Sequence, residues 1–594
     1  MTPRRRLLAL AALLGLLTTL LLSLGHRRVG YVRDEGIYFA ASRQYAAWTA
    51  RLLSEPSTAL SSRERDRAFA LNHEHPAFLK IAAGVSARLL SAPAPPSQTQ
   101  ERAPAGLLPL LPEGAAMRLP AQLLAGLAVA LLFLTGASLA TPHAPPAPKT
   151  SHPAPDAHAS PAPKTSPSDP GPPAPKTSLP LLAGLCAALW FIALPHVWFH
   201  AGLHCFDVPV AVATLAVVLI YRRALSSARW SLALGPALGV AISIKHNALF
   251  IPVLLALHYL ASLALARRRP TLAQLVPLPF VSMAVLAPLT VLALWPWLWT
   301  DPVARLHDYV EFHRLHAYYN TEFFHINYNR PPLPISYPFV LTWATVPTAA
   351  LLLALIGLAL GLRRDLSLQP PVPSTTPPRW TAPLADHPTR DGLLFTLFAV
   401  FPLALIALPT IPIFGGTKHW LTAYPFLALA AASGFVTLAR AAATAKKLRH
   451  LPAVTLALVL VPGLWSTIDG HPHGLAQYAP LVGGPRGAAD LGLLRNFWGH
   501  SVPPSLLDPN AAPGPVYPHD LHELARLQYE REGRWPAAAP SVSPSRARTG
   551  LLFHERHMLS NELDLMQSLG PAPAEVVTQG DVPLTSLYRD KSPP

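Results

Sequence analysis

The chain has 594 residues, of which 51% are hydrophobic and only 13% are charged. That charged share is about half the share in an average soluble protein, and the apolar residues lie in runs of about 20, which is the length that spans a bilayer. The net charge of +16 would suit nucleic acid, but the basic residues cluster at the ends of the apolar runs, where they orient membrane helices. We therefore predict a multi-pass membrane protein that binds no nucleic acid.

Eleven apolar segments are candidates for membrane-spanning helices. They are residues 7–25, 117–140, 179–199, 206–221, 230–243, 248–266, 272–298, 337–362, 392–411, 420–439 and 451–468. The first segment follows three arginines like a signal peptide, but it has no small-residue cleavage site, so we expect it to remain as a span. The two cysteines, Cys186 and Cys205, are too few for a disulfide framework or a thiolate metal cluster.

The distribution of Lys and Arg predicts the orientation of the chain. Starting from Arg4, Arg5 and Arg6, every second connection is basic, as expected for loops that stay in the cytoplasm. These connections contain Lys149, Lys164 and Lys176; Arg222, Arg223 and Arg229; Arg267, Arg268 and Arg269; Arg363, Arg364, Arg379 and Arg390; and Arg440, Lys446, Lys447 and Arg449. We expect the N-terminus in the cytoplasm and the C-terminus outside the plasma (inner) membrane.

The connections divide the chain into a membrane domain, residues 1–468, and an outer tail, residues 469–594. Within the membrane domain, 26–116 and 299–336 are predicted as long outer loops. The inner connection 141–178 repeats PAPKTS three times and has no apolar periodicity, so we expect a disordered insert, with a similar linker at 365–391. In the tail, 519–532 has a helical pattern and 574–588 a strand pattern, which predicts a small domain or an extended cap.

The first outer loop begins with two adjacent carboxylates, Asp34 and Glu35. The apolar residues after them are spaced for a helix lying flat on the bilayer, with Arg43 and Gln44 on its wet side. These apolar residues are Ile37, Phe39, Ala40, Ala41, Tyr45 and Trp48. An acidic pair held at the membrane surface could supply the general base for a reaction on a lipid-linked substrate. The alternative is a solvated pair next to the membrane.

A second acidic position, Glu74, lies later in the same loop, beside His75 and before a second interfacial helix. It could equally be an acidic helix start, which the helix dipole favours. Asp207 begins the fourth span, where an N-cap explains it well. Lys245 sits in a tight outer turn and breaks the positive-inside pattern, which favours a functional role over a snorkelling anchor.

Lys418 and His419 occupy another short outer turn, after two glycines that permit close backbone approach. Together with Lys245 they could bind a phosphate between helices. His313 and His316 lie one turn apart and would share a face of a helix, so with Glu74 they could hold a divalent metal ion. Interfacial histidine is the simpler explanation for them, because membrane surfaces enrich such side chains.

Taken together, these elements resemble the GT-C membrane glycosyltransferases, and within them glycosyltransferase family 39, which includes the protein O-mannosyltransferases and the lipid A aminoarabinose transferases. The elements are the DE pair after the first span, the EHP element at Glu74, the FD-P element at Asp207, the lone outer Lys245 and the KH turn at Lys418. The tail segment HPHGLAQYAPLVGGPRGAADLGLLRNFWGH is similar to one that follows the last span in bacterial members. The chain departs from the family pattern at HPA, where the family has HPP, and at RNFWG, where an acidic residue is missing.

The resemblance implies an all-α GT-C-like bundle of about 11 transmembrane helices, with interfacial helices in the first outer loop. It implies transfer of a sugar from a polyprenyl-phosphate carrier to a hydroxyl on protein, lipid A or a cell-surface glycan, usually with inversion. Asp34 would be the general base, with Glu35 and Glu74 as further acidic site residues. Lys245, Lys418 and His419 would bind the donor phosphate, and Asp207, His75, His313 and His316 would support the site. No cofactor is certain, and a divalent metal ion is one option.

Two other classes of protein remain open at this stage. A secondary transporter would show inverted repeats and polar residues at mid-membrane, whereas this chain has an odd number of segments and ionisable groups at one surface. A catalytically inactive membrane scaffold would keep the spans without needing Asp34, Glu74, Lys245 and Lys418 together.

Overall fold

The computed structural model describes residues 2–94, 104–141, 178–267, 269–368, 379–385, 387–508, 514–536 and 540–590. Apart from its first and last residues, the predicted Pro-rich insert at 141–178 lies outside these ranges, and so does 369–378 within the predicted linker 365–391.

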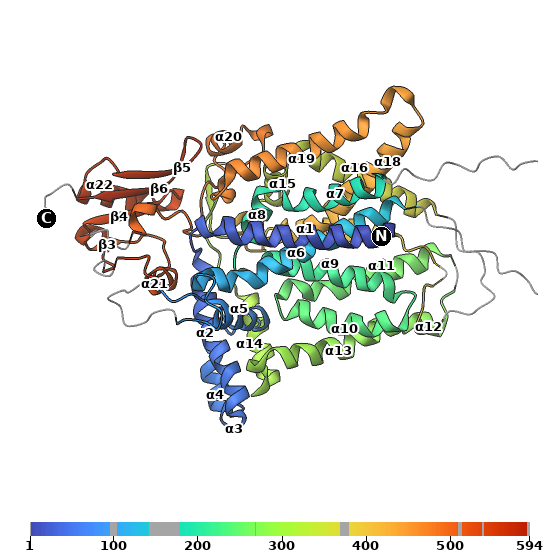
Figure 1. Cartoon of the computed structure of the whole chain (residues 1–594), viewed down its shortest axis with the longest axis horizontal. Coiled ribbons are helices and arrows are strands. Elements are labelled where there is room, and N and C mark those ends of the chain that lie inside the picture. The colour runs from blue at the N-terminus through green and yellow to red at the C-terminus, as the bar shows by residue number, and fades with distance from the viewer. Residues whose placement is uncertain are drawn as a thin grey trace, which may run out of the picture.

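A bundle of helices forms the larger part of the molecule, and its longer members run side by side from left to right in Figure 1. The helices of the bundle are α1 (Pro3–Gly25), α6 (Glu113–Ala140), α7 (Ser178–Ile192), α8 (Pro195–Ala201), α9 (Asp207–Ala224), α10 (Ala228–Ile242), α11 (Ile251–Leu265), α12 (Leu272–Leu275), α13 (Leu278–Leu294), α15 (Tyr337–Thr345), α16 (Thr348–Ser367), α17 (Asp391–Ile406), α18 (Tyr424–Ala443) and α19 (Leu451–Gly470). Each of the eleven predicted apolar segments contains one or two of these helices.

Six helical stretches among the described residues are long and apolar enough to cross a membrane. They are Arg4–Arg28, Glu113–Ala140, His246–Leu265, Leu272–Leu294, Gly416–Ala443 and Leu451–Gly470. The pair α7 and α8, bent by 75° at a short break, is a seventh if it counts as one span. The helices of the other four predicted segments are shorter or carry more charge. The protein is a helical, multi-pass membrane protein.

Small residues allow the helices to approach closely. A Cβ on Gly15 of α1 would lie 2.7 Å from the carbonyl oxygen of Gly126 on α6. Within a bilayer the hydrophobic effect does not drive helices together, so the van der Waals contacts of such close packing stabilise the bundle.

The N-terminus and the basic connections meet at the right-hand end of the bundle in Figure 1. There, Arg440 donates a hydrogen bond to the carbonyl oxygen of Ala140, and Arg222 forms an ion pair with Asp391. The described parts of the basic connections therefore share one end, as the alternation of Lys and Arg predicts. The predicted acidic and phosphate-binding residues lie at the opposite end.

Loop helices cover that opposite end. They are α2 (Arg33–Ser54), α3 (Pro56–Ala59), α4 (Ser62–Ala68), α5 (Phe78–Leu90), α14 (Pro302–Arg314) and α20 (Gly484–Asp490), with an antiparallel hairpin of β1 (Thr321–Phe323) and β2 (Ile326–Tyr328). In Figure 1, α2 runs crosswise to α1, and its side chains Phe39, Tyr45 and Trp48 are buried as the spacing predicts. Of the two residues predicted on the wet side of α2, Gln44 is exposed, and Arg43 is partly exposed and donates to Gln528 of the tail at 2.6 Å.

The tail forms a small α/β domain. It contains β3 (Val516–Tyr517), β4 (Thr549–Phe553), β5 (Glu575–Gln579) and β6 (Val582–Arg589), with α21 (Glu523–Arg531) and α22 (Leu559–Leu569). The strand order is β3-β4-β6-β5, in which β3 and β4 are parallel and the other pairs antiparallel. The predicted helix at 519–532 and strand region at 574–588 correspond to α21 and to the hairpin β5–β6.

Polar contacts fix this tail domain to the first outer loop. The Glu532 carboxylate accepts hydrogen bonds from the Tyr31 hydroxyl at 2.6 Å and from the Gly114 N–H at 2.7 Å. Arg33, the first residue of α2, forms an ion pair with Asp520. The tail is therefore both a small domain and a cap over the helix that carries Asp34.

Candidate functional site

The site begins with an ion pair between residues that are 384 positions apart in the chain. Asp34 lies in the first turn of α2, and Lys418 lies in a 3-10 helix, η4 (Gly416–Ala423), at the entrance to α18. The Lys418 Nζ is 3.6 Å from the Asp34 Oδ2, which is too long for a hydrogen bond. The Asp34 side chain is 26% exposed, and that of Lys418 is 7% exposed. The pair is therefore open to solvent on the Asp34 side.

A second ion pair joins α9 to the turn after α10. The Lys245 Nζ donates to the Asp207 Oδ1 at 2.6 Å, and His200 Nδ1 lies 3.7 Å from Asp207 Oδ2. The explanation of Asp207 as an N-cap is wrong, because Phe206 holds the N-cap position and Asp207 is the first helical residue. Lys245 is not a snorkelling anchor either, since its side chain is only 12% exposed and its ammonium is paired.

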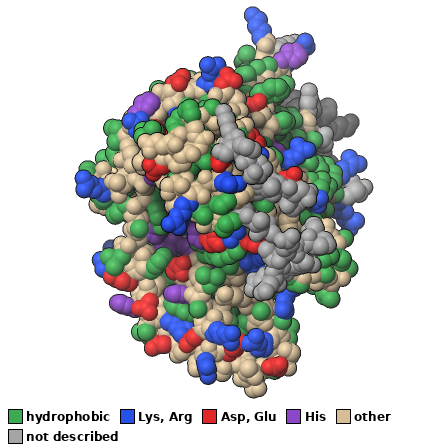
Figure 2. All heavy atoms as spheres, turned by 90° about the vertical axis from the view of Figure 1, so that its left-hand side faces the viewer, with side chains coloured by type: hydrophobic (Ala, Val, Ile, Leu, Met, Phe, Trp, Pro, Cys, Tyr) green, Lys and Arg blue, Asp and Glu red, His purple; other side chains and the backbone are tan. Residues whose placement is uncertain are grey.

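The two ion pairs belong to one electrostatic cluster. The Asp207 carboxylate interacts with both Lys245 and Lys418, and His200 interacts with the same two lysines. The positive charges of the two lysines balance the negative charges of Asp34 and Asp207. An entering anion could therefore replace these carboxylates in part as the partner of the lysines. Figure 2 shows this end of the molecule, where histidine and acidic side chains gather in a hollow near the middle of the face.

Glu35 differs from its neighbour, and the prediction that both carboxylates occupy a surface position is wrong. Glu35 is fully buried, and Arg118 of α6 donates to its two oxygens at 2.7 and 2.6 Å. The backbone N–H of His204 and that of Val32 donate to it as well, at 2.8 and 3.3 Å. The carboxylate is thus committed to holding α2, α6 and the loop before α9 together.

The loop that carries Glu74 and His75 is fixed by a buried lysine. Lys80 donates from Nζ to the carbonyl oxygens of Asn72 and His75, at 2.5 and 2.9 Å, and to Asn72 Oδ1 at 2.9 Å. Burial lowers the pKa of Lys80 well below its ordinary value. Asn72 in turn donates to Glu74 Oε1 at 2.7 Å, so the Glu74 side chain has a defined position.

The histidines do not form the predicted metal set. Helix α14 ends at Arg314, so His316 lies beyond it and stacks on Phe414 with the rings 5.1 Å apart. His313 packs against His246, with ring centroids 4.1 Å apart, and burial lowers its pKa to about 4. Within the described ranges, no group of three or more His, Cys, Asp or Glu side chains could hold a metal ion.

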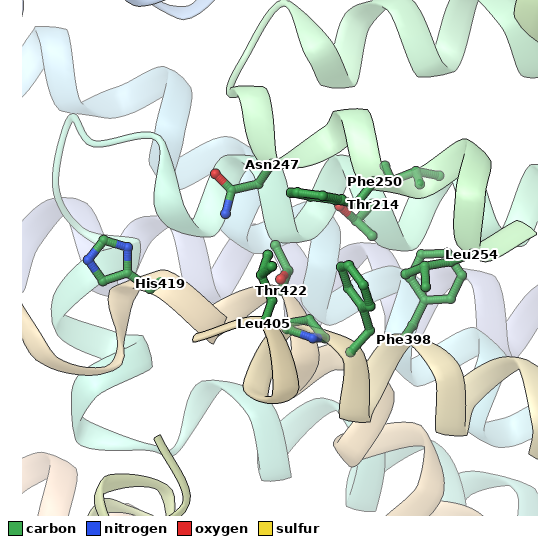
Figure 3. A pocket seen from close by; sticks show the side chains of 11 residues that line it. Thr214, Asn247, Phe250, Leu254, Phe398, Leu405, His419 and Thr422 are labelled. Atoms are coloured by element: carbon green, nitrogen blue, oxygen red, sulfur yellow. The ribbon is translucent and has the colours of Figure 1, made fainter. Parts of the chain in front are cut away.

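His419 stands at the polar end of a groove that continues into the bundle. The groove lies between α9, α11, α17 and the α18 entrance, and Figure 3 shows His419 and Asn247 near one end, with phenylalanines toward the other. Its lining residues are Thr214, Asn247, Phe250, Ile251, Leu254, Phe398, Phe401, Pro402, Leu405, His419 and Thr422. Phe250 is 37% exposed, so the apolar part opens toward the outer surface of the bundle.

Three residues of the site have no counterpart in the sequence-based prediction of roles. They are Trp498 and Phe414, whose rings flank the Lys418 ammonium, and His200, which lies beside Asp207. The W-G element at Trp498 and the FGG element at Phe414 are visible in the sequence, but neither indicates that they meet at Lys418.

No protein-family model and no curated protein sequence matches the chain. Among solved structures, the chain is similar to ArnT from Cupriavidus metallidurans, in the apo state and bound to undecaprenyl phosphate. The apo structure aligns over 97% of both chains, with 14% identity and a TM-score of 0.45. The bound structure aligns over 97% of both chains, with 14% identity and a TM-score of 0.44. Both TM-scores are below 0.5, so function has to be inferred from the site itself.

Proposed function

We propose that this protein is a GT-C-type membrane glycosyltransferase of the plasma (inner) membrane. It would move a sugar from a polyprenyl-phosphate carrier to a hydroxyl acceptor on protein, lipid A or glycan at the extracytoplasmic face. The observation that carries the proposal is the Asp34–Lys418 pair, in which a partly exposed carboxylate lies 3.6 Å from a buried ammonium. The pair combines a proton acceptor and an anion binder, the two groups that this transfer needs.

The donor fits the cluster and the groove together. Its phosphate would bind at Lys418 and Lys245, with His419 beside them, and its polyprenyl chain would lie along the apolar groove. The groove begins at His419, next in sequence to Lys418, so headgroup and tail would occupy connected sites. The basic connections at the other end of the bundle support an extracytoplasmic location for this end, with the N-terminus in the cytoplasm.

In the proposed reaction, the acceptor oxygen forms a bond to the anomeric carbon as the bond from that carbon to the phosphate oxygen breaks. Asp34 takes the proton from the acceptor hydroxyl. The phosphate leaves with the bonding electrons and gains negative charge, which Lys418 and Lys245 stabilise in a site shielded from water. Attack on the face of the anomeric carbon opposite the phosphate would invert its configuration.

The remaining predicted residues divide between contact and support. Glu74, on a loop fixed by Lys80, would bind hydroxyl groups of the sugar or acceptor. Asp207 and His200 would orient Lys245, and Glu35 would hold α2 in place through Arg118. His75, His313 and His316 would support the site.

The decisive experiment is transfer of radiolabelled sugar from a panel of undecaprenyl-phosphate sugars to a crude envelope acceptor. Purified wild type and the Asp34→Asn variant are compared in detergent. Label that moves only with wild type would establish the reaction and name the sugar. If wild type bound none of the donors and moved no label, the transporter and the inactive scaffold would become the better explanations, and the enzyme proposal would be abandoned.

A further inference from the structure

Lys418 reaches the site between two aromatic rings. Its Nζ lies 4.7 Å from the centre of the Phe414 ring and 4.2 Å from that of Trp498. The stem of the lysine passes over Gly415, whose φ is +70°, and a Cβ there would lie 2.7 Å from Lys418 Cε. The FGG turn and the tail residue Trp498 therefore shape one slot for this side chain.

This arrangement differs from that of the other lysine in the cluster. Lys245 donates a 2.6 Å hydrogen bond to Asp207, whereas the Lys418 ammonium makes no hydrogen bond to any residue in the described ranges and only a 3.6 Å ion pair with Asp34. An aromatic face attracts a cation through its quadrupole. It has no lone pair that would accept a hydrogen bond from the ammonium. The three N–H groups of Lys418 thus remain available to the oxygens of an anion.

The main chain of Trp498 connects this slot to the helix that carries Asp34. Its carbonyl oxygen accepts a 2.9 Å hydrogen bond from the Arg33 N–H, one of the N–H groups at the start of α2 that lack a partner within the helix. The φ of Trp498 is +75°, in the left-handed region that is strained for a bulky side chain. Such strain persists only where the surroundings fix it, and it clusters at functional sites.

We infer that Phe414 and Trp498 form an aromatic clamp that holds the Lys418 ammonium with its N–H groups directed to the donor phosphate. Trp498, contributed by the tail, is then a positioning residue that acts through Lys418, and its carbonyl sets the start of α2 relative to the clamp. The inference rests on the proposed function, because the polyprenyl-phosphate donor supplies the anion.

The experiment is a double-mutant cycle on binding, which does not require transfer activity. Dissociation constants of undecaprenyl phosphate and of undecaprenol are measured by thermophoresis on the full-length protein. The variants are Trp498→Leu, Lys418→Met and the double variant, with Trp498→Phe as the conservative change. Trp465→Leu, on α19 with 70% of its side chain exposed, is the matched control for loss of an indole.

We expect Trp498→Leu to weaken the binding of undecaprenyl phosphate roughly tenfold and to leave the binding of undecaprenol unchanged. Trp498→Phe should keep most of the affinity, and Trp465→Leu all of it. In the Lys418→Met background, Trp498→Leu should have no further effect. Equal weakening in both backgrounds, or equal weakening of undecaprenol, would overturn the clamp while leaving the donor class intact. A wild type that does not prefer undecaprenyl phosphate over undecaprenol would overturn the proposed donor, and the phosphate role of the clamp with it.

If Trp498→Leu does not fold, Trp498→Phe and Phe414→Leu still test the clamp, because each removes only part of it. Phe414→Leu should weaken the binding of undecaprenyl phosphate, again only when Lys418 is present. An unchanged affinity in a folded Phe414→Leu protein would overturn the two-ring arrangement.

Discussion

Asp34 and Glu35 are adjacent on α2, but their carboxylates have separate partners. Asp34 is partly exposed and faces Lys418 across 3.6 Å, whereas Glu35 is fully buried and accepts two hydrogen bonds from Arg118. One carboxylate is therefore accessible to a substrate and the other holds the scaffold. Substituting each of them should give opposite patterns of activity and stability.

The first prediction is that Asp34→Asn abolishes sugar transfer without unfolding the protein. The amide keeps the shape of the side chain but cannot accept the proton, so we expect transfer to fall by about 10²- to 10⁴-fold. The melting temperature and the affinity for undecaprenyl phosphate should change little, because the Lys418 contact is loose. Asp308→Asn, on α14 with 69% of its side chain exposed, is the control and should retain full activity. Wild-type transfer by Asp34→Asn would exclude Asp34 as the base.

The second prediction is that Glu35→Gln primarily destabilises the fold. Removing one partner of a buried, hydrogen-bonded ion pair leaves the Arg118 charge uncompensated, which costs roughly 3–5 kcal/mol. We expect a lower melting temperature and a lower folded yield in detergent. The double variant Glu35→Gln/Arg118→Met should recover part of this loss, since it leaves no unpaired buried charge. A folded Glu35→Gln protein of wild-type melting temperature with no transfer activity would instead assign Glu35 to catalysis.

Much of the helical architecture could be predicted from local patterns. Apolar runs of about 20 residues and alternating basic connections are properties of contiguous sequence, so the helical segments and the grouping of the basic residues at one end follow from them. The crosswise α2 follows from the spacing of Phe39, Tyr45 and Trp48. In the tail, the helical pattern at 519–532 and the strand pattern at 574–588 predict a small domain or an extended cap.

The contacts between distant segments could not be predicted in the same way. Asp207 satisfies the sequence rule for an N-cap, but Lys245, 38 positions away, provides a stronger partner for its carboxylate. Arg43 lies on the polar face of α2, and only the folded tail brings Gln528 within hydrogen-bond distance of it. The DE pair looks like one functional unit because nothing local shows that Arg118 takes Glu35 alone.

The third prediction uses the two glycines before Lys418 as a matched pair. Gly415 and Gly416 both have left-handed φ values, of +70° and +61°, so alanine strains the backbone at either position. A Cβ on Gly415 would also lie 2.7 Å from Lys418 Cε, whereas one on Gly416 has no heavy atom nearer than 3.8 Å. We expect Gly415→Ala to weaken the binding of undecaprenyl phosphate at least tenfold more than Gly416→Ala does, measured as dissociation constants. Equal effects would mean that backbone strain alone matters at this turn.

The last prediction concerns Glu555, a buried carboxyl of the tail near the Arg33–Asp520 ion pair. Burial, with a further contribution from Asp520, raises the pKa of Glu555 from 4.5 to about 8. Its Oε1 is buried and has no hydrogen-bond partner among the described residues. Between pH 4.5 and 8 the folded tail therefore keeps a proton that the unfolded chain has lost.

Because the folded state binds more protons in this window, stability should fall as pH rises from about 4.5 to about 8 and level off above that. The full loss is roughly a few kcal/mol. Glu555→Gln resembles the protonated form, so the apparent melting temperature of the variant should exceed that of wild type by an amount that grows from pH 5 to pH 8. Taking the difference between the two proteins at each pH isolates this carboxyl from other titrating groups. Asp581→Asn, with 75% of its side chain exposed, should show no such growth. If the difference in melting temperature between wild type and Glu555→Gln were independent of pH, Glu555 would be ionised throughout the range.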